Sequence, residues 1–403
     1  MDRNIEKHAS LGFKPLVLSL SFAYVLFSYI LDSFISDNLY KYFGNTGAMF
    51  YIKLSALAIS VSIYCLYRFK FYKVELCFLV FYVVYISTSF VGTDSTSEAF
   101  YFWSNIIGYL GVYIVTRALI NHVGYDNFVF IMIFSALAVV LLSLYVDFSN
   151  YERASFRDDN QSTYVCSNIS IRKCGVSNNP NTLAILLMPF FLEILYAMYK
   201  GVINKILTPS LLIVFFMIFI SGSKTIIAMS LLSMMLYGLT MGLFKVFRYF
   251  MYILIVIMIG LNIDLIQVVF NERFVSKSIL DSSGRYEIYL GVLSKLSDNI
   301  FYGVGLNLHE DYSNFFPGWL RLADSAYANI LVSTGIVGII IFIVLLSWQL
   351  YFIYKFDVFR LCLFGLLLFG FFFEDILIRS YSFLFFLAVT FSMVRLSREE
   401  KAL

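Results

Sequence analysis

AYANILVSTGIVGIIIFIVLLSWQL, residues 326–350, contains no charged side chain and is long enough to cross a bilayer. A spanning helix needs about 20 consecutive apolar residues at about 1.5 Å each. Directly before it, residues 271–325 form a long polar interruption that holds Arg285, Lys295 and Arg321 among several acidic side chains. Apolar stretches of spanning length recur on both sides of this interruption, so the sequence predicts an all-α polytopic membrane protein.

The composition agrees with a membrane protein and excludes an ordinary soluble domain. Of the 403 residues, 60% are hydrophobic and 14% are charged, whereas about a quarter of the residues in soluble domains are charged. The first apolar run, residues 16–35, has spanning length and lacks the small-residue cleavage site of a secretory signal, so we expect it to remain as the first helix. The net charge of +3 is spread along the chain and carries no information about nucleic acid, and we expect no nucleic-acid partner for a membrane protein of this kind.

About twelve segments are long and apolar enough to be predicted as transmembrane helices. They cover residues 15–35, 48–67, 74–92, 99–119, 128–146, 181–199, 206–222, 225–244, 248–269, 326–350, 359–373 and 380–396. The chain would form one integral membrane domain, 1–403, with two long connecting loops at 147–180 and 271–325. We expect short helices in the second loop.

The distribution of basic side chains predicts how these helices are oriented. If the first helix enters from the cytoplasm, the short outer loops hold only Lys41, Lys224 and Arg379, and most other lysines and arginines, including Arg117 and Arg360, fall in inner loops. Cytoplasmic loops of membrane proteins carry such an excess. We therefore expect both termini in the cytoplasm and both long loops on the outer side of the membrane.

The five cysteines show no spacing typical of a metal site. Cys65, Cys77 and Cys362 lie in apolar segments and are expected to be core residues. Cys166 and Cys174 flank a polar stretch on the predicted outer side, where a disulfide is permitted, so a bridge and a pair of free thiols both remain open.

Three basic side chains on the expected outer side have the chemistry to bind a diphosphate. Arg172 precedes the predicted sixth helix, Arg285 follows the ninth, and Lys224 lies in the turn SGSK between the seventh and eighth. A guanidinium donates two parallel hydrogen bonds to a phosphate, and a tight turn places an ammonium group at a helix N-terminus, where anions bind. The alternative for the arginines is a solvated loop charge or an anchor to lipid headgroups.

Other outer polar residues have both a structural and a functional interpretation. Asn181 follows Pro180 in an ordinary helix start. Asp324 precedes the helix at 326–350, where it would serve either as the N-cap or as a general base. His309 is the one histidine on the expected outer side, and a loop histidine is often incidental.

Five motifs in chain order resemble the bacterial O-antigen polymerase and O-antigen ligase superfamily. They are NNPNTLA (178–184), SGSK (221–224), SGRYEIY (283–289), YGVGLNLH (302–309) and DSAYANILVSTGIVGI (324–339). The resemblance covers residues 170–345. It implies a multi-pass glycosyltransferase of the GT-C type in the bacterial inner membrane, which acts on undecaprenyl-diphosphate-linked sugars at the periplasmic side without a metal or other cofactor.

The resemblance also implies roles for particular residues. Arg285 matches the large-loop arginine that binds the diphosphate in this superfamily, and Lys224 stands where many members have arginine. Ligases typically have a histidine where this chain has Asp324, which favours a polymerase with Asp324 as base or acceptor-orienting group. The remaining candidates are Arg172 for the diphosphate and His309, Tyr286 and Asn181 for the acceptor or its sugars.

The implied reaction moves the growing glycan from undecaprenyl diphosphate onto the non-reducing end of another lipid-linked repeat unit, with inversion. The implied partners are the lipid-linked oligosaccharide, membrane lipids and a polysaccharide chain-length regulator. Two alternatives remain open: a ligase that moves the finished polymer to lipid A–core, and a lipid-linked oligosaccharide flippase or other transporter. A transporter would have charges inside the bundle, where only Lys53, expected to snorkel outward, and Glu193 are clear candidates.

Overall fold

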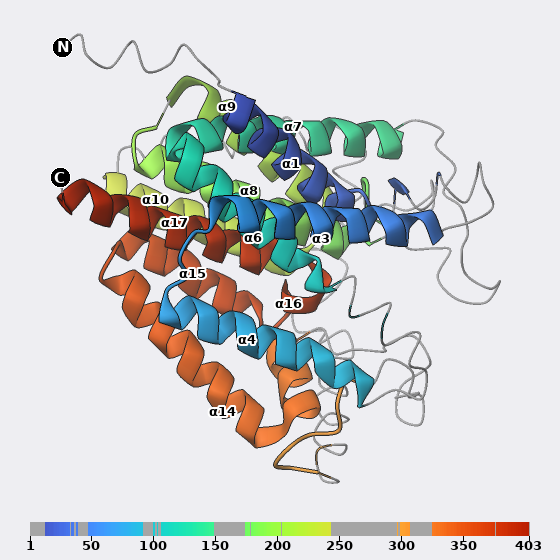
Figure 1. Ribbon diagram of the computed structural model, residues 1–403. Helices are drawn as coiled ribbons and strands as arrows, with labels where there is room; N and C mark the ends of the chain where they lie inside the picture. The colour runs from blue at the N-terminus through green and yellow to red at the C-terminus, as the bar shows by residue number, and fades with distance from the viewer. Residues whose placement is uncertain are drawn as a thin grey trace.

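A computed structural model describes residues 13–32, 34–35, 38, 47–91, 100, 103, 106–148, 174–177, 179–202, 204–242, 296, 299–306, 325–374 and 376–402. All regular structure in these ranges is helical, and the helices pack as one bundle (Figure 1). The elements are α1 (Phe13–Ile30), α3 (Gly47–Tyr67), α4 (Lys73–Ser87), the 3₁₀ helix η2 (Thr88–Phe90), α6 (Tyr109–Val123), α7 (Tyr125–Phe148), α8 (Pro180–Tyr199), α9 (Asn204–Ser221), α10 (Lys224–Met241), α14 (Ala326–Tyr354), α15 (Val358–Gly370), α16 (Ile376–Arg379) and α17 (Ser382–Ala402).

The predicted fold class, an all-α polytopic membrane protein, is confirmed. Within the described ranges, 6 helices are long and apolar enough to cross a membrane, and α1, α9 and α15 are shorter apolar helices. Each predicted span overlaps a described helix except 248–269, which lies outside the described residues.

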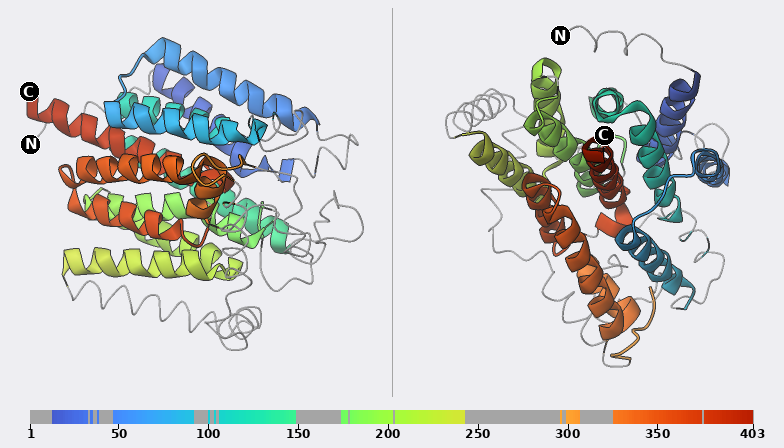
Figure 2. Two further views of the ribbon diagram at one scale, coloured as in Figure 1. Left: turned by 90° about the horizontal axis from the view of Figure 1, so that it is seen from below. Right: turned by 60° about the vertical axis from the view of Figure 1, so that its left-hand side comes forward.

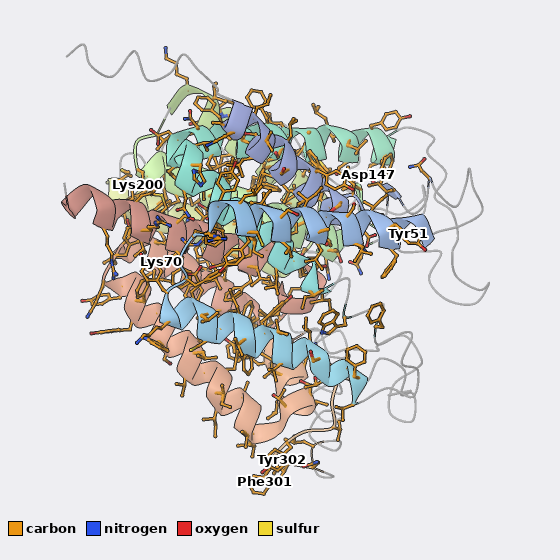
Figure 3. The ribbon with its side chains drawn as sticks, in the orientation of Figure 1. Tyr51, Lys70, Asp147, Lys200, Phe301 and Tyr302 are labelled. Carbon is orange, nitrogen blue, oxygen red and sulfur yellow. The ribbon has the colours of Figure 1, made fainter. Side chains whose placement is uncertain are left out.

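The two ends of the bundle differ in chemistry. α1 begins and α17 ends at the same end (Figure 1), where the α3–α4 connection with Lys70 and the α8–α9 connection with Lys200 also lie (Figure 3). We call this the basic end. At the opposite end lie Asp147 near the end of α7 and the turn between α9 and α10. Cys174, which is disulfide-bonded, lies beside Asp147, so we call this the disulfide end.

Helices α8 and α17 form the centre of the bundle (Figure 2, right). Nearly all residues of α8 are buried, and the helix contacts α7, α9, α10, α15 and α17. Because lipid can cover an apolar helix face in a membrane, the burial of α8 comes from the helices packed around it. These two helices therefore set the positions of the outer helices around them.

Two arginines that the sequence places in inner loops are instead buried within helices. Arg117 lies in α6 with 0% exposure, and its Nε is 3.0 Å from an Oε1 of Glu75 in α4. Glu75 also accepts a hydrogen bond from the Tyr113 hydroxyl. The predicted span 99–119 includes Arg117, but the charge distribution assigned this residue to an inner loop. That assignment was wrong, because α6 continues to Val123 and an arginine with a carboxylate partner can remain inside the bundle.

Arg360 forms a second buried ion pair. Its Nη1 and Nη2 donate to the two carboxylate oxygens of Glu193 at 2.8 and 2.5 Å, and its Nε donates to Thr390 at 2.8 Å. Arg360 and Glu193 are both 0% exposed. Glu193 was predicted as an intramembrane charge, but Arg360 was expected in a loop. The pair joins α8 to α15, which are distant in sequence.

Lys53 is also paired instead of snorkelling outward. Its side chain is 6% exposed and its ammonium nitrogen lies 2.7 Å from a carboxylate oxygen of Asp32. The expectation of a solvent-directed lysine was therefore wrong, because Asp32 neutralises the charge beside the helix.

Helix α14 is broken at Gly335, where φ is 66° and ψ is −166°. The segment 299–306 packs into the break: Val304 and Gly305 donate backbone hydrogen bonds to the carbonyls of Val332 and Ser333, and Ile336 and Val337 donate to the carbonyls of Ile300 and Phe301. In a bilayer, a break leaves backbone groups that must find other partners. Segment 299–306 supplies those partners.

Candidate site at the disulfide end

The structure places two of the seven predicted site residues. Lys224 and Asn181 are described, and both lie in the first turn of a helix at the disulfide end. Asp324, Arg285, Arg172, His309 and Tyr286 lie outside the described residues. The geometry of the site is therefore built from Lys224, Asn181 and their surroundings.

The SGSK motif forms the predicted tight turn between two helices. α9 ends at Ser221, Gly222 has φ of 66°, and Lys224 is the first residue of α10. The amide of Gly222 donates to the Phe219 carbonyl at 3.0 Å, which closes the last turn of α9. The half-buried Lys224 ammonium group thus belongs to a helix N-terminus, where the first amides have no intrahelical acceptor.

Ser223 is the N-cap residue of α10, but its side chain does not cap the helix. Its Oγ is buried, with Ser223 2% exposed, and makes no hydrogen bond within the described part of the chain. A capping serine usually accepts a hydrogen bond from the second or third amide of its helix. In α10 the Ser223 hydroxyl makes no such hydrogen bond to the second or third amide. The hydroxyl and these amides lie beside Lys224.

Helix α8 begins at the same end with a complete cap. The Asn179 side chain accepts a hydrogen bond from the Asn181 amide at 2.8 Å, and Pro180 occupies the first helical position. The structure confirms the N-terminal signals predicted from NNPNTLA. Asn181 itself is partly exposed.

Helices α8 and α10 run in the same direction and contact each other, which fixes the level of Asn181 relative to Lys224. The Ser230 hydroxyl lies 3.6 Å from the Met188 sulfur. Ser230 is six residues after Lys224, and Met188 is seven residues after Asn181. Since each residue advances a helix by about 1.5 Å, Lys224 and Asn181 lie at nearly the same depth.

The chain before α8 is held firmly against α7. The amide of Gly175 donates to both carboxylate oxygens of Asp147, at 2.9 and 3.0 Å. Cys174 is buried and disulfide-bonded, whereas Cys65, Cys77 and Cys362 are free. The expectation that the free cysteines are core residues was wrong for Cys65 and Cys77, which are exposed. Cys166, one of the two cysteines between which a bridge was left open, lies outside the described residues.

The start of α14 also lies at the disulfide end, and its N-cap is not Asp324. Ser325 is the N-cap: its Oγ accepts from the Ala328 amide at 3.4 Å and donates to the Phe371 carbonyl at 3.1 Å. The capping interpretation of Asp324 was therefore off by one residue. A serine at this position satisfies the helix, so α14 does not need the Asp324 carboxylate as a cap.

The described part of the chain is thus an integral membrane bundle with an incompletely satisfied helix N-terminus and a lysine at its disulfide end. This combination suits a membrane protein that binds an anionic group at one surface. Residues 209–343 match the sequence model of a protein family described as O-antigen ligase. No curated protein matches the chain.

The matched range contains Lys224 and its turn, whereas Asn181 lies before it. It begins within α9, includes the SGSK turn and segment 299–306, and ends in α14 beyond the break at Gly335. Over residues 209–343, the match supports the O-antigen polymerase and ligase superfamily that the five motifs indicated. Two of those motifs, YGVGLNLH and DSAYANILVSTGIVGI, contact each other through the backbone hydrogen bonds at the α14 break.

Proposed function

We propose that the protein is an O-antigen polymerase of the bacterial inner membrane. It transfers the growing glycan from undecaprenyl diphosphate onto the non-reducing end of another lipid-linked repeat unit. The family match supports this class of reaction and implies lipid-linked saccharide substrates. Asp324, at the position where ligases typically have histidine, favours polymerisation over ligation.

The observation that carries the proposal is the SGSK turn inside the matched range. Lys224, the buried Ser223 hydroxyl and the first amides of α10 form a site for an anion. Transfer of the glycan leaves a multiply charged lipid diphosphate, so cations and donors directed at the leaving group stabilise the charge as it develops. Removing one such donor commonly lowers the rate by about 10²–10³.

Residues outside the described ranges complete the proposed site. Arg285 and Arg172 bind the diphosphate together with Lys224, and Asp324 accepts the proton of the acceptor hydroxyl or orients it. Transfer then proceeds with inversion and without a metal. Acceptor and sugar contacts are assigned to His309, Tyr286 and Asn181.

In the proposed orientation, the disulfide end faces the periplasm and the basic end faces the cytoplasm. The disulfide at Cys174 supports the first part, because disulfides persist in oxidising compartments. Lys70, Lys200 and Lys355 at the basic end support the second, because cytoplasmic loops are enriched in lysine and arginine. Both termini are then cytoplasmic, and a chain-length regulator is the proposed partner in the membrane.

Gel electrophoresis of lipopolysaccharide from a strain that lacks the gene tests the proposal. A polymerase deletion should leave core carrying single repeat units, and the wild-type gene should restore the ladder of long chains. Arg285→Ala and Lys224→Ala should fail to restore normal chain lengths at normal membrane levels of protein. Lys205→Ala, which changes an exposed lysine at the basic end of α9, is the matched control and should restore the ladder.

The ligase is the second candidate, because the matched family is described as O-antigen ligase. Loss of a ligase would leave core with no repeat units while lipid-linked polymer accumulates. An unchanged ladder in the deletion strain would exclude both the polymerase and the ligase.

A further inference from the structure

An apolar groove lies between α7 and α9, with a volume of about 530 Å³. This volume falls in the range of ligand sites, roughly 300–1,000 Å³. Every side chain that lines it is a hydrocarbon. These side chains are Leu137, Val140, Leu141 and Leu144 from α7, and Leu212, Ile213 and Phe216 from α9.

The groove occupies the half of the bundle nearest the disulfide end. On α7, its lining residues lie between four and eleven residues before Phe148, and on α9 between five and nine residues before Ser221. With a rise of about 1.5 Å per residue, the groove therefore extends from about 6 to about 16 Å below these helix ends. In the proposed orientation, that depth is the outer leaflet.

The groove opens on the lipid side of the bundle. Leu141 is 66% exposed and Ile213 is 42% exposed. A phosphate or sugar would lose its hydrogen bonds to water there and find no partner, which is costly in free energy. The chemistry of the lining therefore selects a hydrocarbon chain that enters sideways from the membrane.

Helix α9 connects this groove to the anion site. Phe216 lies in the groove wall, and α9 ends five residues later at Ser221, the first residue of the turn that carries Ser223 and Lys224. An amphiphile with one hydrocarbon chain in the groove would place its anionic head near this turn. A polyprenyl diphosphate has one chain joined to its head, whereas a membrane phospholipid has two.

We propose that the α7–α9 groove holds the polyprenyl chain of the lipid-linked substrate, directly below the diphosphate at the SGSK turn. This inference rests on the proposed function and adds to it the part of the protein that recognises the lipid. The groove contributes to the binding of the long-chain substrate, and it makes no contact with a substrate whose prenyl chain is too short to reach it.

Kinetics with purified full-length protein in nanodiscs test the inference. The substrates are a lipid-linked repeat unit with a long polyprenyl chain and the same glycan diphosphate on a short prenyl chain. Leu141→Trp and Ile213→Trp fill the groove with a larger side chain. For the long-chain donor we expect KM to rise about tenfold, which corresponds to withdrawing about two methylene groups from apolar contact. For the short-chain donor we expect no change in KM.

The chain offers matched controls for both substitutions. Phe134 lies seven residues before Leu141 on α7 and is 69% exposed, and Ile206 lies seven residues before Ile213 on α9 and is 46% exposed. Seven residues are nearly two helical turns, so each control lies on the same face of its helix but outside the groove. Phe134→Trp and Ile206→Trp should leave both KM values unchanged.

The outcomes separate the groove from the proposed function. If the wild-type protein transfers no glycan from either donor, the proposed function fails. If the wild type is active but the groove variants have the same KM values as their controls, the assignment of the groove fails while the function stands. The same holds if the groove variants raise KM equally for the long-chain and the short-chain donor.

Discussion

Arg360 shows how much a single buried charge depends on its partner. Its guanidinium is 0% exposed, donates to both oxygens of Glu193, and also donates to Thr390 and the Phe386 carbonyl. Arg360→Ala leaves the Glu193 carboxylate buried without its cation, at a cost of about 3–5 kcal/mol. We expect a large fall in the thermal midpoint of the detergent-solubilised protein, measured by intrinsic fluorescence.

The controls for Arg360→Ala use the same region of the bundle. Lys200→Ala breaks the ion pair with Asp357, but the Lys200 side chain is 35% exposed and Asp357 keeps hydrogen bonds from Tyr196 and the Arg360 amide. Its cost should stay within about 1 kcal/mol. The double substitution Glu193→Gln with Arg360→Met should recover part of the lost stability. Equal thermal midpoints for Arg360→Ala and Lys200→Ala would contradict a stabilising role for the Arg360–Glu193 pair.

Sequence could predict Glu193 as an intramembrane charge but not the residue that neutralises it. Arg117 and Arg360 lie close to the inner ends of the predicted spans 99–119 and 359–373, so the charge distribution assigned them to inner loops. Their carboxylate partners are 42 and 167 residues away in the sequence. Only the tertiary fold, which places α4 near α6 and α8 against α15, brings these charges together.

At the scale of elements, the break in α14 depends on two glycines in contact. A Cβ added to Gly335 would lie 2.3 Å from the Phe301 carbonyl oxygen, and one added to Gly303 would lie 2.4 Å from the Val332 carbonyl oxygen. Both residues also have positive φ, at 66° and 73°. A side chain at either position must therefore push segment 299–306 out of the break.

We predict that Gly303→Ala and Gly335→Ala each reduce O-antigen chain length sharply. The backbone groups of Val332, Ser333, Ile336 and Val337 lose their partners in a region without water to replace them. Chain length is measured on lipopolysaccharide gels, with membrane levels of each variant measured by immunoblotting. Gly365→Ala on α15 is the control, because an added Cβ there meets nothing within 4 Å.

Normal chain lengths with Gly303→Ala or Gly335→Ala would show that the backbone contact is dispensable. Loss of the protein from the membrane would instead mean that the contact is needed for folding. Because alanine is favoured over glycine in a helix, Gly365→Ala should be neutral or slightly stabilising.

Hydropathy predicted most of these elements because a bilayer demands long apolar helices. It could not predict the break in α14, because glycine is common in transmembrane helices and need not interrupt them. The SGSK turn was predictable from four adjacent residues. The groove was not, because its wall combines two faces whose pairing depends on how α7 packs against α9.

The whole molecule has an asymmetry of charge and redox chemistry between its two ends, which leads to a prediction about its orientation. Lys200 lies at the basic end (Figure 3). Val91, 79% exposed, follows η2 at the far end of α4, which begins at the basic end. We expect Val91→Cys to react with a membrane-impermeant maleimide in spheroplasts. Lys200→Cys should react only after the membrane is permeabilised.

The labelling uses a variant in which the free cysteines Cys65, Cys77 and Cys362 are replaced by serine, so that the maleimide reacts only with the introduced cysteine. Cys174 is kept, because its disulfide protects it from the maleimide. The opposite pattern would place Lys224 and Asn181 in the cytoplasm. That side holds reducing conditions, in which a disulfide at Cys174 would not persist. Labelling therefore tests the charge bias, the disulfide and the periplasmic placement of the proposed site together, because all three require the same end of the bundle to face outward.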